Sequence, residues 1–321
     1  MAAVVSSVLA VLVIGTALVV GYFVFATRRI AARAEMAVPP SGKFIDIDGN
    51  RIHYAEAGAG PAIVFIHGLG AQFHQFEHPL FDRLSADFHL VALDRPGSGY
   101  SVRAAGASAG LSEQARIIVR LIEQLGLERP LLVGHSLGGM VALTVAIEHP
   151  NVISGLALLS PYTHFSGEVA PAFAALHIAQ PWKRWLIAQT TAIPTALRTA
   201  PQVLDFIFGP QPVPADYAIK GGGFSGLRPS HFYATASDLV AVDQEMQHFM
   251  ARYGEIDMPA GILFGTADRV LPYELHGVAM QDRIAGLDLE LLDGIGHMPQ
   301  FVAADRVAAF IRKMAARAFA A

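Results

Sequence analysis

The sequence predicts an α/β fold in which helices cover both faces of a mostly parallel central sheet. Short apolar runs typical of buried strands alternate with segments of helical periodicity. The alternation stops for about 95 residues after residue 161 and then resumes, which indicates a segment inserted between two strands of one sheet. A long uncharged stretch precedes the whole pattern.

That first stretch, residues 1–27, contains no charged side chain and exceeds the ~20 apolar residues that a helix needs to cross a bilayer. A secretory signal peptide is the alternative, but it normally has a basic start and a shorter apolar core. Arg28, Arg29 and Arg33 follow the stretch, and no Lys or Arg precedes it. The positive-inside rule therefore predicts a single-pass membrane protein whose remaining chain stays in the cytoplasm.

Composition excludes several classes of function. The formal net charge is −4, so the chain lacks the basic surface that nucleic acid requires. There is no cysteine, which excludes disulfides, thiolate metal sites and a cysteine nucleophile. Neither a cofactor nor a metal is expected. The sequence leaves the oligomeric state open.

The rest of the chain divides into three parts. Residues 28–42, which include the Pro-containing "AVPPSG", are expected to form a linker that isolates the anchor. Residues 43–161 and 256–321 are expected to form the sheet and its helices. A hairpin is predicted from "FIDI" and "RIHYAEAG", buried strands at 62–66, 88–94, 130–135, 153–160, 260–265 and 287–293, and helices at 73–86, 112–125, 137–149 and from Pro299.

Residues 162–255 are expected to form an inserted, largely helical cap or lid. Its aromatic side chains either pack the cap on the core or favour access of a lipophilic substrate; these are Trp182, Trp185, Phe206 and Phe208. The run Gly221-Gly222-Gly223 predicts either a hinge or an ordinary loop.

Two serines occupy the pattern Gly-x-Ser-x-Gly, which is typical of a nucleophile on a sharp turn. Ser108, in "GASAG", follows no strand and lies among small residues, which predicts a flexible loop. Ser136, in "GHSLG", lies between an apolar strand and an apolar helix. Such a turn needs glycine two residues before and two after the serine, so Gly134 and Gly138, together with His135, are expected to support it. Ser136 is the candidate nucleophile.

A serine hydroxyl needs a base, and the base needs an orienting carboxylate. Asp268 lies in the loop after one late strand, and His297 lies in a Gly-flanked loop after the next. The order Ser136, Asp268, His297 is the one expected for this architecture. Asp293, four residues before His297, is a competing acid, although it does not follow the penultimate strand.

An oxyanion hole is expected from backbone N–H groups. Leu137 follows the nucleophile at a helix N-terminus, where the dipole favours negative charge. Leu69, after His67-Gly68, is the second expected donor, unless His67-Gly68 is merely a tight turn. His74, Glu77 and His78 could share a helix face as metal ligands, but their spacing is not a zinc-protease pattern.

The motifs HG, DRPGSG, GHSLGG, GTADRV and GHMP occur in this order. On these motifs, residues 43–318 resemble the α/β-hydrolase superfamily, most of all its esterases and C–C hydrolases. The resemblance implies that Ser136 is the nucleophile, Asp268 its acid and His297 its base, with Leu69 and Leu137 as oxyanion donors.

Two further positions bear on the resemblance. Asp94-Arg95-Pro96-Gly97 matches a structural turn of the family, and we assign it no catalytic role. Some relatives keep the acid after the strand that ends in "LALLS", but here Ser160-Pro161 occupies that place. A serine at 136 also excludes the haloalkane dehalogenase and epoxide hydrolase branches, which use aspartate there.

The predicted function is a membrane-anchored serine hydrolase that cleaves a carboxylic ester, with small hydrophobic or lipid-like esters favoured. Its expected partners are that substrate and the lipid bilayer. C–C bond hydrolysis or lactone cleavage by the same triad is one alternative. A ligand-binding protein of this fold without catalysis is another.

Overall fold

The computed structural model describes residues 1–165, 167 and 171–320 of the chain. Its centre is an eight-stranded sheet in the order β1-β2-β4-β3-β5-β6-β7-β8. β2 pairs antiparallel with β1 and β4, and every other neighbouring pair is parallel. The predicted α/β fold with a mostly parallel sheet is confirmed.

The strands lie within two residues of the predicted ranges, because each is a short apolar run ended by turn residues. They are β1 (Lys43–Ile47), β2 (Asn50–Ala57), β3 (Ala62–Ile66), β4 (His89–Leu93), β5 (Leu131–His135), β6 (Gly155–Leu159), β7 (Ala260–Gly265) and β8 (Asp288–Leu292).

Helices connect the strands. The α-helices are α1 (Ala2–Ala37), α2 (His74–Leu84), α3 (Leu111–Gln124), α4 (Leu137–Glu148), α5 (Pro181–Gln189), α6 (Ala192–Phe208), α7 (Pro229–Met250), α8 (Tyr273–His276), α9 (Pro299–Val302) and α10 (Ala304–Ala318). Short 3₁₀ helices are η1 (Pro150–Val152), η2 (Pro171–Leu176), η3 (Gly223–Gly226), η4 (Tyr253–Glu255) and η5 (Val278–Asp282). The expected last helix is divided into α9 and α10, because Ala303 between them has a non-helical ψ of 41°.

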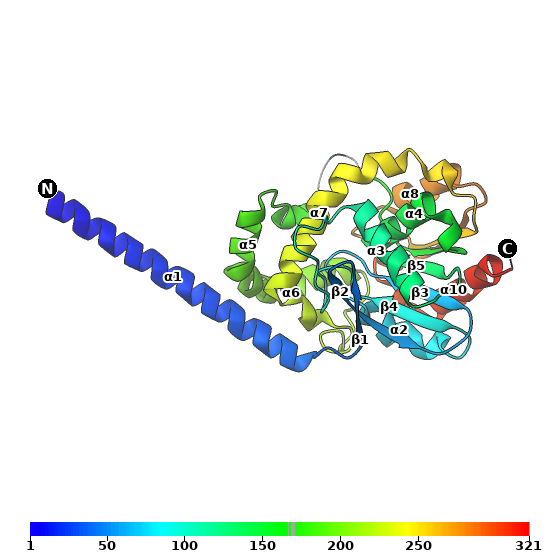
Figure 1. Cartoon of the computed structure of the whole chain (residues 1–321), viewed down its shortest axis with the longest axis horizontal. Coiled ribbons are helices and arrows are strands. Elements are labelled where there is room, and N and C mark those ends of the chain that lie inside the picture. Colours follow the sequence, from blue (N-terminus) through cyan, green and yellow to red (C-terminus); the bar gives the residue numbers. More distant parts are fainter. Residues whose placement is uncertain (166, 168–170, 321) are drawn as a thin grey trace.

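Two hydrophobic clusters cover the two faces of the sheet. Val64 and Ile66 of β3 pack in one cluster with side chains of α3 and α4. Ile63 and Phe65 of the same strand pack in the other cluster with α2 and α10. Alternate residues of a strand point to opposite faces, and a parallel sheet is buried on both. Figure 1 shows α3 and α4 on one side of the sheet and α2 and α10 on the other.

The chain between β6 and β7 contains α5, α6 and α7, and we call this inserted segment the cap. Several of its hydrogen bonds are made to loops that follow the carboxyl ends of strands. The His231 ring bonds to Gly70 O, after β3, and accepts from Gly99 N, after β4, both at 3.0 Å. The Gln211 side chain accepts from Gly296 N, after β8, at 2.9 Å. The cap therefore covers the sheet edge at which open α/β folds bind ligands.

The helix α1 continues to Ala37 and so includes most of the segment, residues 28–42, that the sequence suggests as a linker. Residues 31–37, "AARAEMA", are good helix formers. The helix ends because Pro39 restricts the residue before it to extended backbone. Only the residues from Val38 to Gly42 connect α1 to β1.

The C-terminal part of α1 packs on the cap. The Thr27 hydroxyl donates to Thr190 O at 2.5 Å, and Ala34 is buried against Ile193 of α6. Glu35 forms an ion pair with Arg228 at 2.9 Å. By contrast, side chains 4–22 of α1 are exposed throughout.

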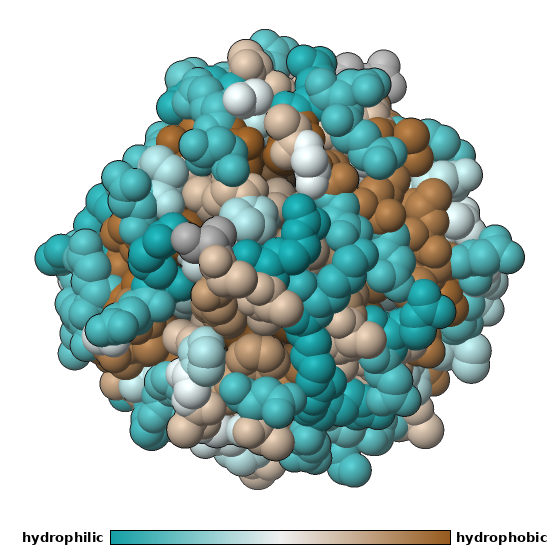
Figure 2. Space-filling model, turned by 90° about the vertical axis from the view of Figure 1, so that its right-hand side faces the viewer, coloured by the Kyte–Doolittle hydropathy of each residue, from teal (hydrophilic) through white to brown (hydrophobic). Residues whose placement is uncertain are grey.

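Among the described residues, α1 alone is both long and apolar enough to cross a membrane. Figure 1 shows its N-terminal half extending away from the globular part. Figure 2 views the opposite end of the molecule, where hydrophilic side chains spread over most of the face. The apolar excess of the chain is therefore concentrated at one end.

The packing of α1 predicts different effects for two N-terminal truncations. Side chains 4–21 are exposed, so removing residues 1–21 is expected to leave the melting temperature of the detergent-solubilised protein unchanged. Removing residues 1–36 also deletes the Thr27 and Ala34 contacts, at a cost of about 2 kcal/mol. Calorimetry should then show a decrease of roughly 4 °C for the shorter chain. Equal melting temperatures would show that α1 is not part of the folded domain.

Candidate active site

A strand-to-helix turn places Ser136 at the carboxyl edge of the sheet. β5 ends at His135 and α4 begins at Leu137, so Ser136 alone connects them. It has φ 51° and ψ −121°, a strained conformation for a residue with a side chain. The residue is half-buried, and within the described structure its hydroxyl has no hydrogen-bond partner.

The turn requires glycine on both sides because backbone segments approach closely. A Cβ at Gly134 would lie 2.5 Å from Gly138 O, and one at Gly138 would lie 2.0 Å from Ile66 O of β3. Gly68, in the loop after β3, approaches the serine itself, since a Cβ there would lie 3.1 Å from Ser136 Cβ. The loop after β3 and the turn after β5 are thus packed directly together.

Asp268 and His297 form a buried pair beside this turn. Asp268 Oδ2 and His297 Nδ1 are 2.7 Å apart, and the two side chains are 0% and 6% exposed. The other carboxylate oxygen, Oδ1, accepts from the N–H groups of Val270 at 2.7 Å and Leu271 at 2.9 Å. The carboxylate is therefore held by three donors in one orientation.

The environment of Asp268 keeps it ionised. Burial raises the pKa of its carboxyl, but the neighbouring His297 charge and hydrogen bond and the two backbone donors outweigh burial, so the pKa is lowered overall. An ionised Asp268 accepts a hydrogen bond from the N–H at Nδ1 of His297, so that Nε2 is left unprotonated and free to act as a base.

His135 connects the His297 loop to the serine turn. Its Nε2 donates to His297 O at 2.9 Å. Burial and the neighbouring His297 lower the pKa of His135 to about 3, so its ring is neutral. Because His135 immediately precedes Ser136, this bond holds the His297 loop next to the Ser136 turn. No hydrogen bond joins Ser136 Oγ to His297 Nε2 within the described structure; such bonds often form only once substrate is bound.

Two unused N–H groups lie at this turn. Within the described part of the chain, the backbone N–H groups of Leu69 and Leu137 donate to no protein acceptor. Leu137 is the first residue of α4, where the helix dipole favours negative charge. Leu69 follows Gly68, the residue that packs against Ser136. Both N–H groups are therefore available to an oxyanion.

Arg95, to which the sequence assigned no role, holds the loop that carries Leu69. Its side chain is fully buried, with Nε donating to His67 O at 3.0 Å and Nη2 donating to Gly68 O at 3.1 Å. Nη1 forms a 2.6 Å ion pair with Asp238 of α7. Arg95 thus ties the loop after β3 to the cap. The sequence could not predict these bonds, because nothing in the turn motif around Arg95 indicates a partner as distant in sequence as Asp238.

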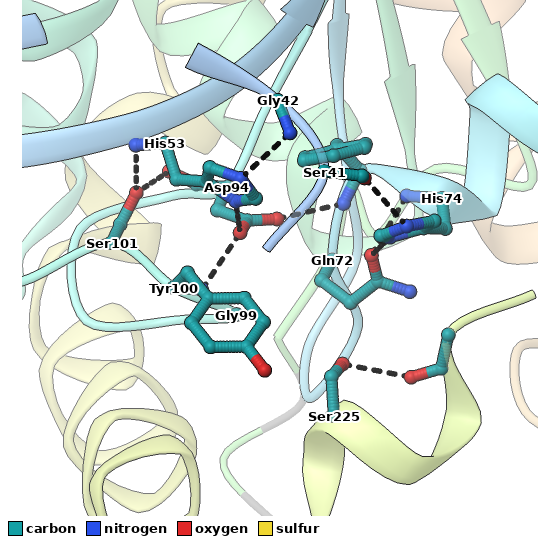
Figure 3. Close-up of polar contacts among 12 residues, drawn as sticks. Ser41, Gly42, His53, Gln72, His74, Asp94, Gly99, Tyr100, Ser101 and Ser225 are labelled. Atoms are coloured by element: carbon teal, nitrogen blue, oxygen red, sulfur yellow. Dashed lines mark hydrogen bonds and ion pairs between the residues drawn. The ribbon is translucent and has the colours of Figure 1, made fainter. Parts of the chain in front are cut away.

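Asp94 organises a second polar network, shown in Figure 3. Its Oδ1 accepts from Phe73 N at 2.8 Å, and its Oδ2 accepts from Tyr100 N at 2.8 Å and lies 2.7 Å from His53 Nδ1. These bonds fix the start of α2, at the end of the loop that contains Leu69. Arg95 thus holds the beginning of this loop, and Asp94 holds its end.

The neighbouring Gln72 attaches this loop to the cap. Its amide donates to Gly221 O at 2.9 Å. A Cβ at Gly222, where φ is 73°, would lie 1.8 Å from the same amide. The Gly221-Gly222-Gly223 run therefore packs closely on the core in this structure.

The alternative site residues lie apart from the pair. Asp293 is exposed and accepts from Thr266 Oγ1 at 3.1 Å. Ser108 is exposed in a loop, where its hydroxyl accepts from Gly110 N at 3.0 Å. Of the histidines considered as metal ligands, His78 pairs with Asp216 at 3.2 Å. No group of three or more His, Asp or Glu residues suited to a metal ion occurs in the part of the chain that the structure describes.

Comparison with known sequences gives partial and near-complete matches. The chain is 39% identical over 121 residues to a dihydrolipoyllysine-residue acetyltransferase component of an acetoin-cleaving system from Cupriavidus necator, a match that covers 37% of this chain and 32% of that protein. The chain thus spans about a third of the length of that relative. It is 27% identical over 268 residues to 2-hydroxy-6-oxo-6-phenylhexa-2,4-dienoate hydrolase from Comamonas testosteroni, over 81% of this chain and 89% of that protein.

Solved structures of similar fold include a membrane phospholipase A described as a bacterial virulence factor. It superposes with a TM-score of 0.65 at 23% identity, over 98% of this chain and 99% of that one. An esterase from Exiguobacterium antarcticum superposes with a TM-score of 0.67 at 23% identity, over 85% of this chain and 99% of that one. At such identities the likeness is one of fold.

A family model described as the alpha/beta hydrolase fold matches residues 61–304, which include Ser136, Asp268 and His297. The match covers most of the chain and agrees with the strand order of the sheet. The protein therefore belongs to the α/β-hydrolase fold family.

Proposed function

We propose that this chain is a membrane-anchored serine hydrolase that cleaves carboxylic esters through the triad Ser136, His297 and Asp268. The observation that carries the proposal is the 2.7 Å contact of buried Asp268 with His297 Nδ1, next to a serine on a strained turn. Likeness in fold to an esterase and to a membrane phospholipase A supports the ester as substrate.

The reaction proceeds in two steps. His297 Nε2 removes the proton from Ser136 Oγ as Oγ attacks the ester carbonyl carbon. The carbonyl oxygen becomes an oxyanion that accepts from the N–H groups of Leu69 and Leu137. The C–O bond then breaks, the alcohol leaves with the proton from His297, and an acyl-serine remains. Water, deprotonated by His297, releases the acid and restores the serine.

The N-terminal helix holds the enzyme at a membrane. Side chains 4–22 of α1 are exposed and mostly apolar, and a helix of about 20 such residues crosses a bilayer. Arg28, Arg29 and Arg33 follow the apolar run and favour a cytoplasmic position for the catalytic domain. A hydrophobic or lipid-like ester would be concentrated at the same membrane.

C–C bond hydrolysis is a second candidate. The relative from Comamonas testosteroni, which matches over 81% of this chain, is named as a hydrolase of a 2-hydroxy-6-oxo-dienoate. The same nucleophile and base could serve such a reaction, in which an enolate rather than an alkoxide leaves. The two candidates therefore differ in substrate and share the catalytic residues.

Replacing Ser136 tests the nucleophile. Ser136→Ala removes only a hydroxyl and is expected to lower kcat on a butyrate ester by about 10⁴-fold while leaving the melting temperature unchanged. Ser108→Ala, in the other Gly-x-Ser-x-Gly sequence, should retain full activity. A fluorophosphonate probe should label the wild type and Ser108→Ala but not Ser136→Ala. Equal loss in the two variants would contradict the assignment, and an unlabelled wild type would favour a non-catalytic protein.

Replacing the two candidate acids tests which one orients His297. Asp268→Asn is expected to lower kcat by about 10⁴-fold, because the amide can hold the imidazole in the wrong tautomer. Asp293→Asn changes an exposed side chain that contacts Thr266 and should have little effect. Steady-state kinetics of both variants on one ester decide the matter. The reverse ranking would mean that the acid is Asp293, which follows β8, and not Asp268, which follows β7.

A panel of substrates separates the two candidate reactions. We expect the purified full-length protein to hydrolyse p-nitrophenyl esters, with kcat/KM rising as the acyl chain is lengthened from acetate to octanoate, because apolar groups gain free energy on leaving water. A 2-hydroxy-6-oxo-dienoate should be turned over far more slowly. Faster cleavage of that ketone than of every ester would favour the C–C hydrolase instead.

A further inference from the structure

Two helices of the cap carry exposed apolar side chains next to the N-terminal helix. Trp182 and Trp185 of α5 are 62% and 59% exposed, and Leu186, Leu197 and Val203 of α5 and α6 are also exposed. Of the cap aromatics named from the sequence, only Phe208 is fully buried, where it packs against Tyr217 and Phe301. We call the exposed set Trp182, Trp185, Leu186, Leu197 and Val203 the α5–α6 face.

The contacts of α1 with the cap show where along α1 the α5–α6 face lies. α1 contacts α5, α6 and η3. Its burial begins at Phe23, and the Thr27 hydroxyl bonds to Thr190 at the end of α5. Residues 2–22 of α1 rise about 1.5 Å each and so span roughly 32 Å. This length matches the ~30 Å hydrocarbon core of a bilayer.

If residues 2–22 cross the hydrocarbon core, Phe23 and the cap helices that contact the following part of α1 lie at the membrane–water boundary. Figure 1 shows α5 at the side of the globular part that faces the free half of α1. Exposed apolar side chains therefore occur both on the free half of α1 and on the two cap helices that contact α1. Burying exposed tryptophan and leucine is favourable, and tryptophan is enriched at membrane boundaries.

We propose that the α5–α6 face is a membrane-docking surface that rests in the boundary region of the bilayer crossed by α1. The charged residues of α5 and α6 are mostly basic, and Asp205 near the end of α6 is the one acidic residue of the two helices. α5, "PWKRWLIAQ", has no acidic residue, and Lys183 is exposed between the two tryptophans. Arg28 and Arg29 of α1 are also exposed, and they directly follow Thr27, which bonds to Thr190 at the end of α5. These cations complement anionic lipid headgroups.

A docked cap would connect the membrane to the active site. α6 begins beside α1, where Ile193 packs on Ala34. It ends at Phe208, and the following Gln211 bonds to Gly294 O and Gly296 N in the loop that carries His297. A lipid ester in the boundary region of the bilayer would thus contact the cap, and the length of α6 would separate it from the triad. This inference rests on the anchor in the proposed function and not on the catalytic assignment.

The two tryptophans make the proposal directly measurable, because they are the only ones in the chain. Full-length protein is reconstituted in vesicles of phosphatidylcholine and phosphatidylglycerol, with or without acyl chains brominated near the headgroup. Bromine quenches tryptophan only in contact, so the fluorescence is expected to fall roughly twofold if the rings lie in the boundary region. Iodide added on both sides of the membrane should quench the reconstituted protein less than the detergent-solubilised one.

A chain with Trp182→Phe, Trp185→Phe and Phe319→Trp is the matched control. Phe319 is 36% exposed near the C-terminus, at the end of the molecule far from α1. Its tryptophan should be quenched by iodide and not by brominated lipid. Flotation with the vesicles shows whether the chain is inserted, and Ser136→Ala can replace the wild type throughout because fluorescence needs no turnover.

Three outcomes would overturn the proposal. Iodide quenching without bromolipid quenching would place the α5–α6 face in water. Protection from both quenchers would mean that a second copy of the chain covers the face. A chain that does not float with the vesicles would remove the anchor on which the proposal rests. Loss of esterase activity with intact bromolipid quenching would instead reject only the proposed reaction.

Discussion

The close approach of three backbone segments at Ser136 is the constraint on which the candidate site depends. Ser136 alone connects β5 to α4, and glycines two residues away on each side admit the neighbouring backbone. The same turn exposes the N–H of Leu137 and brings Gly68 against the serine. A side chain at either glycine would collide with backbone, which cannot move aside as a flexible side chain can. The strained φ of 51° at Ser136 persists because the buried strand and helix hold both ends of the turn.

Buried charge connects this turn to the cap. Arg95 and Asp238 are both fully buried and lie 2.6 Å apart, and Arg95 also donates to carbonyl groups of the loop after β3. A buried ion pair is tolerated only when its remaining polar groups are also bonded. Any shift of α7 would therefore leave Arg95 without its carboxylate. The position of the cap and the geometry of the Leu69 loop are coupled through this one side chain.

Local patterns predicted most of the fold, and they predicted that Asp268 and His297 follow the last two strands, where the structure brings the two side chains together. β3 coincides with the predicted 62–66 because an apolar run bounded by Gly60-Pro61 and His67-Gly68 has one interpretation. Partners distant in sequence were not predictable. The extension of α1 to Ala37 follows from local helix propensity, but its packing on Ile193 depends on where the cap lies. The bonds of Arg95 and the exposure of Trp182 depend likewise on tertiary structure, because the same sequence pattern is compatible with a packed or an exposed side chain.

The central claim is that Ser136 carries an acyl group during turnover. The most direct test is rapid acid quenching of full-length protein mixed with a butyrate ester, followed by mass spectrometry of its peptides. A butyryl group on the peptide that contains Ser136, formed and lost at rates consistent with kcat, is the expected result. Turnover without an adduct, or an adduct on another residue such as Ser108, would contradict it.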